Sequence, residues 1–254
     1  MSSAADVRLV ALVPTYDNPR SVARVVEGIR RHLPDVLVID DGSGPEGREA
    51  CAALGERGLA QVVRRPTNGG KGAAVKTGFA AARARGYTHA FQIDADGQHD
   101  LDAIPRFVAA AQAHPDALVL SVPVFGDDVP PGRILARSIT QFWVNLETGG
   151  RVIHDPMCGF RVYPLAPLAA LQIGADRMDF DPEVAVRLVW SGVPVLNLPL
   201  DVFYPPDRVS HFRLLRDNLA LSGLHARLCI ERVVGGLLLG RRFHRRELPA
   251  EAGR

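Results

Sequence analysis

The sequence is poor in cysteine and has no long apolar run. Its three cysteines, Cys51, Cys158 and Cys229, are widely spaced and form no CxxC pair, which argues against a disulfide framework and favours a reducing cytoplasm. The most apolar stretch, 228–240, is interrupted by charged residues and falls short of the roughly 18 residues that span a bilayer. The first apolar run has no basic segment before it, so we expect a strand there and no signal peptide. These absences predict a cytoplasmic protein, in solution or on the inner face of a membrane.

Two common nucleotide-binding signatures are also missing. The P-loop pattern GxxxxGK[ST] fails because Arg65 occupies its first glycine position and Gly72 follows Lys71. No GxGxxG follows the first apolar run, where PTYDNP stands instead. Both absences count against ATPases and NAD-dependent enzymes.

A strong charge imbalance is missing as well. The chain has 30 lysines and arginines against 28 acidic residues, a formal net charge of +2, which argues against nucleic acid as the main partner. Lysine occurs only at Lys71 and Lys76, so nearly all basic residues are arginines. A run of arginines with few acids marks the last part of the chain: Arg213, Arg216, Arg227, Arg232, Arg241, Arg242, Arg245 and Arg246. This run is compatible with an anionic membrane surface.

Short apolar runs alternate with amphipathic segments in the first half. We expect strands at 8–13, 35–39, 60–64 and 87–93, and helices at 19–33, 45–58 and 72–85. This alternation predicts an α/β fold with a Rossmann-like, mainly parallel central sheet flanked by helices.

The second half is less regular. We expect a helix at 133–147, a strand near the end of 154–163, a helix at 180–192, a strand at 193–204 and amphipathic helices over 212–240. The sequence therefore predicts a main domain over 1–210. Residues 211–254 would form an amphipathic helical extension with a basic tail, either packed on that domain or facing a membrane.

Each of the four predicted strands in the first half is followed by a polar segment. The segments are PTYDNP, DDGSG, TNGGKGAAVKTG and DADGQHD, and the carboxyl ends of parallel strands are where such sheets bind ligands. Asp94 and Asp96 share one face of a strand end, and two such carboxylates are stabilised by a divalent ion that bridges to phosphate. Asp and Gln oxygens suit Mg²⁺ or Mn²⁺ better than zinc. On its own, however, DADG is more typical of a turn.

Six segments together resemble a known family. VPTYDNP, VIDDGS, NGGKGAAVKTG, DADGQH, DPMCGFRVY and FDPEV are similar, in order and spacing over about residues 8–205, to the inverting family 2 glycosyltransferases with the GT-A fold. Within them, the resemblance is to dolichol- or polyprenyl-phosphate mannosyl- and glucosyltransferases. Each segment alone is weak, whereas the six in order are specific.

The resemblance implies a nucleotide-sugar donor site and a metal. It assigns to the donor Pro14, Tyr16 and Asp41 at the base and ribose, Asn68, Gly70 and Lys71 beside them, and Asp94 at the ribose or sugar. Asp96 and Gln98 would hold Mg²⁺ or Mn²⁺ on the diphosphate, where the ion neutralises the departing nucleoside diphosphate. His99 could reach the metal, but a loop or exposed position fits it better.

The acceptor decides whether a catalytic base is needed. A phosphate monoester, with a second pKa near ~6, is already an ionised nucleophile at neutral pH, whereas a hydroxyl needs a carboxylate base. Arg133 and Arg137 lie four apart on a predicted helix and resemble the family's acceptor-phosphate clamp, although a solvated helix face would show the same spacing. Glu183 or Asp181 could be the base, and Glu183 could instead form a salt bridge to Arg161.

The segment DVFYPPDRVSHFR departs from the family pattern Y-x-x-R-x-x-G-x-S-K. Ser210 is kept, but Arg208 replaces the glycine and His211 replaces the lysine, and all three remain candidates for binding the acceptor. The following residues, 216–228, resemble more loosely glycosyltransferases of bacterial lipid and aryl-polyene pathways. Cys158 has no base near it in the sequence, so we interpret it as a packing residue.

These observations predict a metal-dependent, inverting hexosyltransferase. Its donor would be of the UDP-glucose or GDP-mannose type, and its acceptor a lipid-linked phosphate such as polyprenyl phosphate. The alternative acceptor is a hydroxyl of a lipid or aryl-polyene-type molecule, with Glu183 or Asp181 as base. A non-catalytic binding protein and a nucleotidyltransferase are less compatible with the intact acidic set and the missing glycine-rich loop.

Overall fold

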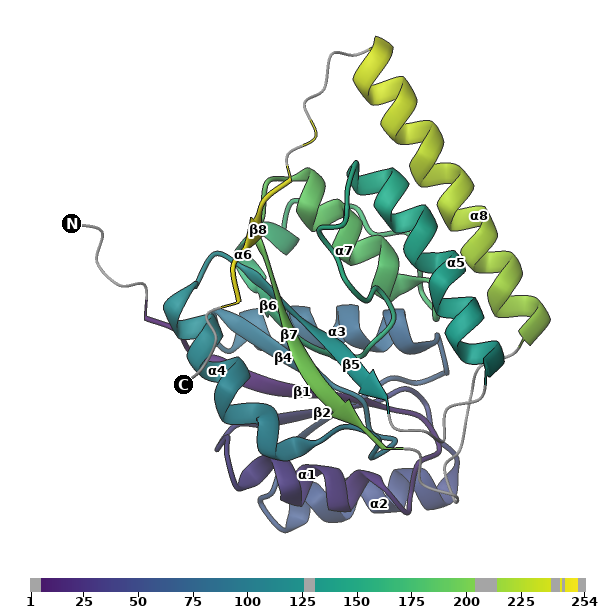
Figure 1. The fold of residues 1–254 in the computed structure, drawn as a ribbon. Helices are drawn as coiled ribbons and strands as arrows, with labels where there is room; N and C mark the ends of the chain where they lie inside the picture. The colour runs from purple at the N-terminus through teal and green to yellow at the C-terminus, as the bar shows by residue number, and fades with distance from the viewer. Residues whose placement is uncertain (1–5, 126–130, 204–213, 239–242, 244, 251–254) are drawn as a thin grey trace.

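The computed structural model describes the chain apart from residues 1–5, 126–130, 204–213, 239–242, 244 and 251–254 (Figure 1). Its centre is a twisted sheet with the strand order β3-β2-β1-β4-β6-β5-β7-β8. The strands are β1 Leu9–Thr15, β2 Val36–Asp40, β3 Gln61–Arg64, β4 His89–Ile93, β5 Leu118–Phe125, β6 Phe160–Pro164, β7 Val195–Val202 and β8 Glu247–Leu248. β6 runs antiparallel to both of its neighbours, β4 and β5, and the other pairs are parallel. The prediction of a mainly parallel α/β sheet is confirmed.

Helices cover both faces of this sheet. They are α1 Val22–Arg30, α2 Pro45–Glu56, α3 Lys71–Ala84, α4 Ile104–Ala113, α5 Pro131–Thr148, α6 Leu165–Leu168, α7 Phe180–Trp190 and α8 Leu214–Val233. Buried residues of α1, α2 and α4 form one core cluster with the sheet, and those of α3 and α7 form the other. α5 and α8 lie side by side against α7 and complete the second layer (Figure 1).

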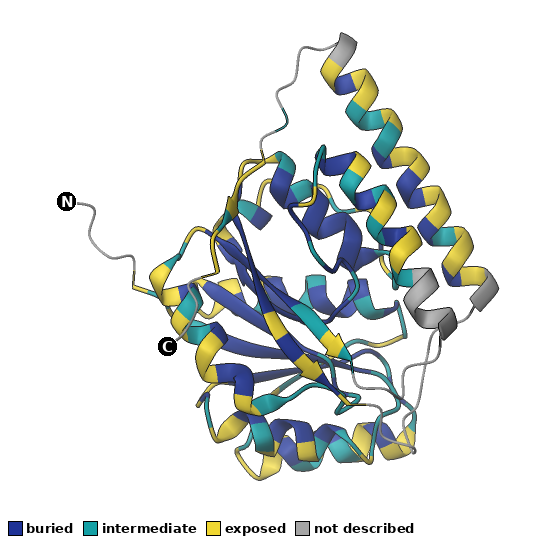
Figure 2. Ribbon diagram, viewed as in Figure 1, coloured by how far each residue is buried: buried dark blue, intermediate teal, exposed yellow. Residues whose placement is uncertain are grey.

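The sequence explains why the central strands are hidden. β2 and β4 are buried along their whole length, as expected for parallel strands covered on both faces (Figure 2). On α1, Val22, Val25, Val26 and Ile29 recur at helical spacing and face the core. Gly78 lets α3 approach β1 closely, because a Cβ there would overlap the side chain of Leu12.

Some elements were not predicted. α4, β5 and the short α6 lie in stretches to which no element was assigned, and β8 lies in the predicted basic tail, where it pairs with β7. The predicted C-terminal helix is α8, followed by a π-helical turn at Val234–Leu238. None of the described helices combines the length and the apolar character needed to cross a membrane.

Candidate active site

The carboxyl ends of β2, β1 and β4 lie next to one another, because these three strands are neighbours and run parallel. This arrangement brings the polar segments after each strand to one edge of the sheet. The start of α3, with Lys71, and the start of α7, with Asp181, reach the same edge. The predicted convergence of separate loops is therefore present in the structure.

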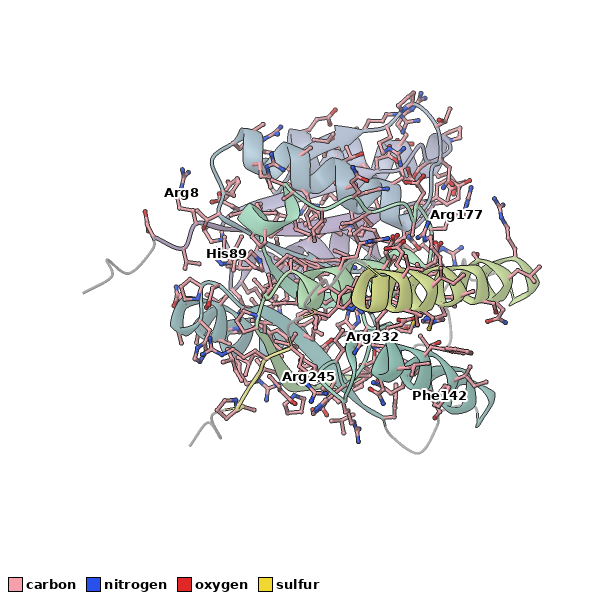
Figure 3. The ribbon with its side chains drawn as sticks, turned by 90° about the horizontal axis from the view of Figure 1, so that it is seen from above. Arg8, His89, Phe142, Arg177, Arg232 and Arg245 are labelled. Atoms are coloured by element: carbon pink, nitrogen blue, oxygen red, sulfur yellow. The ribbon has the colours of Figure 1, made fainter. Side chains whose placement is uncertain are left out.

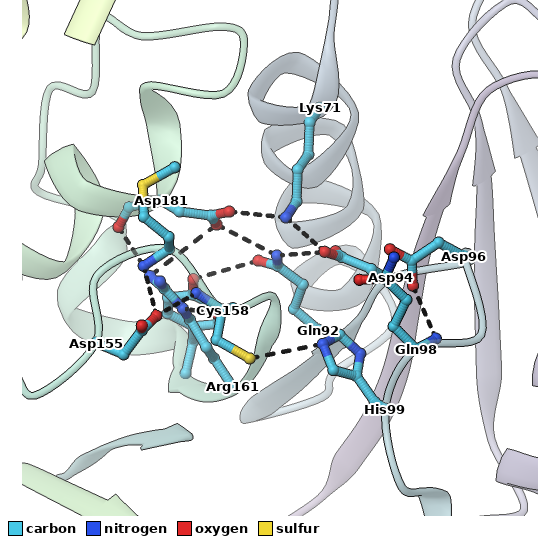
Figure 4. A network of polar contacts seen from close by, with 12 residues as sticks. Lys71, Gln92, Asp94, Asp96, Gln98, His99, Asp155, Cys158, Arg161 and Asp181 are labelled. Carbon is cyan, nitrogen blue, oxygen red and sulfur yellow. Dashed lines mark hydrogen bonds and ion pairs between the residues drawn. The ribbon is translucent and has the colours of Figure 1, made fainter. Parts of the chain in front are cut away.

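At this edge the Lys71 ammonium lies between two carboxylates. Its Nζ is 2.7 Å from Asp94 Oδ2 and 2.7 Å from Asp181 Oδ2 (Figure 4). Burial alone would lower the pKa of Lys71, but the two carboxylates outweigh burial and raise it. The ammonium therefore stays charged at every physiological pH.

The two carboxyl groups differ in their proton affinity. Burial raises the pKa of Asp94, and Lys71 only partly offsets this effect. Burial would also raise the pKa of Asp181, but Lys71 and Arg161 outweigh burial and lower it. Asp181 is therefore a stable anion, whereas Asp94 takes up a proton more readily.

Three further residues of this network were not identified from the sequence. Gln92, Arg161 and Tyr163 are fully buried in β4 and β6. Gln92 contacts Asp181 and Asp94, and Arg161 donates to the Asp181 carbonyl (Figure 4). The Tyr163 hydroxyl donates to Gln92. The available signal was a polar side chain within an apolar strand, which requires a buried partner.

Gly159 shows how closely the strands approach at this point. A Cβ at this position would overlap the carboxylate of Asp94. The glycine of the CGFR segment is thus required so that β6 can pass beside the acidic group of β4.

The DADGQH segment forms a tight turn beyond β4. Gly97 has a φ of 73°, and the Gln98 N–H donates to Asp96 Oδ1 at 3.1 Å, which brings Asp96 and Gln98 together (Figure 4). Within the described residues, no group of three or more His, Cys, Asp and Glu side chains could hold a metal ion. The side-chain oxygens of Asp96 and Gln98 are hard donors that fit Mg²⁺ or Mn²⁺, and phosphate oxygens and water would complete the coordination shell of the ion. The donor set therefore fits a metal shared with a diphosphate.

His99 lies next to this turn and contacts Cys158. Its Nε2 is 3.5 Å from Cys158 Sγ, and its ring lies 5.3 Å from that of Phe160. Burial lowers the pKa of His99, but Cys158, Asp96 and Asp94 outweigh burial and raise it to about 9. The interpretation of Cys158 as a packing residue agrees with its burial, although a histidine distant in the sequence does lie beside it.

The predicted donor wall is shaped by Asp41. Its carboxylate accepts hydrogen bonds from the Gly69 N–H at 3.1 Å, the Gly70 N–H at 2.7 Å and Arg65 Nη1 at 2.5 Å. Asp41 therefore fastens the NGGK loop to the end of β2. Three other donor residues lie at the same edge: Pro14 in β1, Tyr16 just beyond it and Asn68 in the NGGK loop.

On the predicted acceptor side, only Arg137 has a described side chain. It forms an ion pair with Asp155 and lies over the ring of Phe125, 5.0 Å from its centre. Asp155 also accepts from the N–H groups of Met157 at 2.9 Å and Cys158 at 2.7 Å. The remaining acceptor candidates lie outside the described residues: Arg208, Ser210, His211 and the side chain of Arg133.

A cavity of about 460 Å³ adjoins Arg137, between β5 and α5. Its lining residues combine cationic, amide and apolar groups: Val122, Pro123, Phe125, Arg137, Ser138, Gln141, Phe142, Asn145, Arg151, His154 and Asp155. Asp155 belongs both to this lining and to the network of Figure 4. A chain of hydrogen bonds through Cys158 and Arg161 thus links the cavity lining at Asp155 to Asp181 in the Lys71 cluster.

The two candidate bases have different surroundings. Glu183 is fully buried and binds Arg187 at 2.7 Å, Arg227 at 2.8 Å and the Ala175 N–H at 2.7 Å. The alternative that Glu183 forms a structural salt bridge is confirmed, but the suggested partner Arg161 is wrong, because Arg161 Nη1 donates to the Asp181 carbonyl at 2.8 Å. The contacts of Glu183 are with Arg187, Arg227 and the Ala175 N–H and not with the Lys71 cluster, which argues against a catalytic role. Asp181 is the candidate that lies at the Lys71 cluster.

The fold has solved counterparts. The chain is similar to the crystal structure of glucosyl-3-phosphoglycerate synthase from Mycobacterium tuberculosis in complex with Mn²⁺ and UDP-glucose, with a TM-score of 0.66 and 18% sequence identity. The match covers 90% of this chain and 79% of that one. At this level of identity the likeness defines the architecture, which is the GT-A fold of sugar transferases.

The chain belongs to glycosyl transferase family 2, whose sequence profile matches residues 10–169. It is 30% identical over 203 residues to polyprenol monophosphomannose synthase of Mycolicibacterium smegmatis, covering 76% of each chain. It is 27% identical over 204 residues to undecaprenyl-phosphate mannosyltransferase of Micrococcus luteus, covering 76% of this chain and 83% of that one. The protein is therefore a glycosyltransferase.

Proposed function

We propose that the protein transfers a hexose, with inversion and with a divalent metal, from a nucleoside diphosphate sugar to a lipid-linked phosphate of the polyprenyl phosphate type. The observation that carries this proposal is the placement of Lys71, Asp94, Asp96 and Gln98 at one sheet edge, beside a cavity lined by Arg137. The two mannosyltransferase relatives support the choice of acceptor.

On the donor side, Asp96 and Gln98 would hold the metal on the diphosphate. When bound, the ion supplies positive charge to the leaving nucleoside diphosphate. Asp94 would lie at the ribose or sugar, and Lys71 would form part of the wall beside it. Because Lys71 keeps its charge and is fixed by two carboxylates, it offers a preorganised cation to the transferred group.

On the acceptor side, the cavity has the mixed character that a lipid phosphate requires. Arg137, Arg151 and His154 supply cationic or hydrogen-bonding groups, whereas Phe125 and Phe142 supply apolar surface. A phosphate is ionised at neutral pH, so arginines to bind it matter more than a base.

The test is transfer of label from UDP-glucose and GDP-mannose to polyprenyl phosphate with Mn²⁺ or Mg²⁺. We expect a lipid-extractable product with at least one donor and none when the metal is chelated. No product with any donor and lipid phosphate tested would count against the proposal. Nuclear magnetic resonance of the product's anomeric centre checks the inversion.

A hydroxyl acceptor is the second candidate, and the position of Asp181 favours it because a carboxylate does lie at the site. With a phosphate acceptor, Asp181→Asn should lower kcat by about tenfold, because the site loses a charge. With a hydroxyl acceptor, it should lower kcat by about 10²–10⁴-fold, because the base is removed.

Glu183→Gln is the matched control for Asp181→Asn. We expect it to lower thermal stability and leave kcat unchanged, because Glu183 binds Arg187 and Arg227. A large fall in kcat for Glu183→Gln would contradict this assignment.

We also propose that α5 and α8 face the membrane that carries the lipid. Large apolar side chains on α5 are exposed at Ile139 and Phe142, the latter 62% exposed, and Figure 3 places Phe142 at the outer edge of the molecule. On α8, Leu219 is 72% and Ile230 63% exposed. An apolar helix face with arginines nearby is typical of binding at the surface of a bilayer.

A further inference from the structure

The strands β4 and β6 contain polar side chains where only apolar ones are expected. Gln92, Arg161 and Tyr163 are completely buried, and Gln92 lies opposite Arg161 in the antiparallel register. A buried polar side chain is costly unless it is hydrogen-bonded. The hydrogen-bond partners of these three residues therefore indicate which role they have in the site.

Gln92 binds the same two carboxylates as Lys71, from the other side. Its Nε2 donates to Asp181 Oδ1 at 3.2 Å and, at a longer 3.5 Å, to Asp94 Oδ1, whereas Lys71 binds the Oδ2 atoms of both (Figure 4). Each carboxylate thus has one oxygen on the ammonium and the other on the amide. The two contacts together fix the rotation of both carboxylate planes.

Tyr163 decides which way the Gln92 amide points. Its hydroxyl donates to Gln92 Oε1 at 3.2 Å. A glutamine amide has an acceptor oxygen on one side and two N–H donors on the other. With the oxygen bound to Tyr163, the N–H groups must face Asp94 and Asp181.

We propose that Gln92, oriented by Tyr163, is a positioning residue that holds Asp94 on the donor side and Asp181 on the acceptor side in a fixed mutual orientation. The roles of the two sides rest on the proposed function. Lys71 alone cannot do this, because an ammonium attracts carboxylates without fixing their planes. Arg161 cannot replace Gln92 either, since its short contact is with the Asp181 backbone carbonyl at 2.8 Å.

Tyr163→Phe tests the proposal with the smallest change, because it removes one hydroxyl and keeps the ring. We expect kcat to fall about fivefold, the effect of one lost hydrogen bond, while KM for the donor stays within about twofold. The melting temperature should also fall, because the buried Gln92 Oε1 loses this hydrogen bond, so the split between kcat and KM carries the test. Tyr87→Phe is the matched control: Tyr87 precedes β4, bonds to Asp35 and lies outside the network, so kcat should not change.

A double-variant comparison separates positioning from a general packing role. Gln92→Met keeps the side-chain length and should lower kcat at least about tenfold, because both carboxylates lose their orientation. Adding Tyr163→Phe to it should cause no further loss, since Tyr163 acts through Gln92. Additive losses, or an unchanged kcat in Gln92→Met, would overturn the proposal. If Gln92→Met does not fold, Gln92→Asn, whose amide is one methylene shorter and cannot span Tyr163 and the two carboxylates, should be as slow.

Hydrogen exchange of the Gln92 side-chain amide tests this proposal without measuring catalysis, so it is independent of the proposed function. In the wild-type protein, the Gln92 side-chain amide should give a pair of nuclear magnetic resonance signals that exchange slowly with water, and Tyr163→Phe should speed that exchange. Slow exchange in both proteins would overturn the orienting role of Tyr163, even if sugar transfer occurs. Failure of the wild-type protein to transfer sugar to any lipid phosphate would contradict the proposed function and leave the exchange result standing.

Discussion

Lys71 is one of two lysines in the chain, and its surroundings explain why a cation is needed there. Asp94 and Asp181 come from different elements and meet at its ammonium. Two buried carboxylates without a cation between them would repel each other and would lack the solvation that water provides. The lysine therefore permits the two acids to share one site.

Replacing Lys71 with methionine keeps the length of the side chain and removes its charge. We expect the free energy of unfolding to fall by about 3 kcal/mol at neutral pH, because two buried charges lose their partner. For a chain of this size, the melting temperature should drop by about 6–12 °C. Thermal unfolding followed by circular dichroism measures this change.

The other lysine provides the control. Lys76 lies on the same helix and binds Asp176 at 2.7 Å near the surface, so Lys76→Met should cost less than about 1 kcal/mol. In Lys71→Met, the folded-state pKa values of Asp94 and Asp181 should lie above those of the unfolded chain. The folded state then binds more protons as the pH falls, so the penalty should shrink toward about pH 5. Equal losses for the two variants, or a penalty independent of pH, would contradict this account.

At the scale of elements, the start of α7 could be predicted from the sequence, but the orientation of its two carboxylates could not. Asp181 and Glu183 both belong to FDPEV, and residues two apart on a helix point in different directions. The sequence could identify the pair but could not tell which carboxylate faces the site. The answer depends on Lys71, Arg187 and Arg227, which pack against α7 from other parts of the chain.

The same limit applies to the strands. β1, β2 and β4 and the loops after them were predictable, because their apolar runs and turn residues are local signals. β8 has only two residues and exists because it pairs with β7. Gln92 likewise gives no local signal of its partners, since Tyr163 and Asp181 are 71 and 89 positions away.

The exposed faces of α5 and α8 give a prediction for this pair of helices. Phe142→Asp should reduce co-sedimentation with vesicles that contain anionic lipid by about tenfold or more, because a charge replaces an inserting aromatic ring. Val124→Ser, which changes an exposed apolar residue on β5, serves as the control and should bind as the wild-type protein does. Unchanged binding of Phe142→Asp would show that α5 does not face the bilayer.

At the scale of the whole molecule, binding of the donor nucleotide should raise the free energy of unfolding. A nucleoside diphosphate with Mn²⁺ at about 100 times its Kd should add about 2.7 kcal/mol, because the ligand binds only the folded chain. The corresponding rise in melting temperature is about 5–10 °C. A thermal-shift panel of UDP and GDP, with and without Mn²⁺, measures it and identifies the base.

Asp96→Asn should remove the part of this shift that depends on Mn²⁺. Asp102→Asn, at an exposed position in the next turn, is the matched control and should keep it. A metal-dependent shift that survives in Asp96→Asn would place the ion elsewhere.

The antiparallel insertion of β6 between β4 and β5 has a consequence for how the chain folds. The β4–β6 ladder joins strands about seventy residues apart, and forming it requires closing a long loop before any of its contacts are gained. Such non-local pairing slows folding. A nascent chain that ends before β6 has already made β1, β2 and β4 but lacks Arg161, Tyr163 and Asp181, so Lys71 and Asp94 meet their remaining partners only late in synthesis. The Lys71 cluster can therefore be completed only after β6 and the start of α7 have been synthesised, although β1, β2 and β4 precede them in the chain.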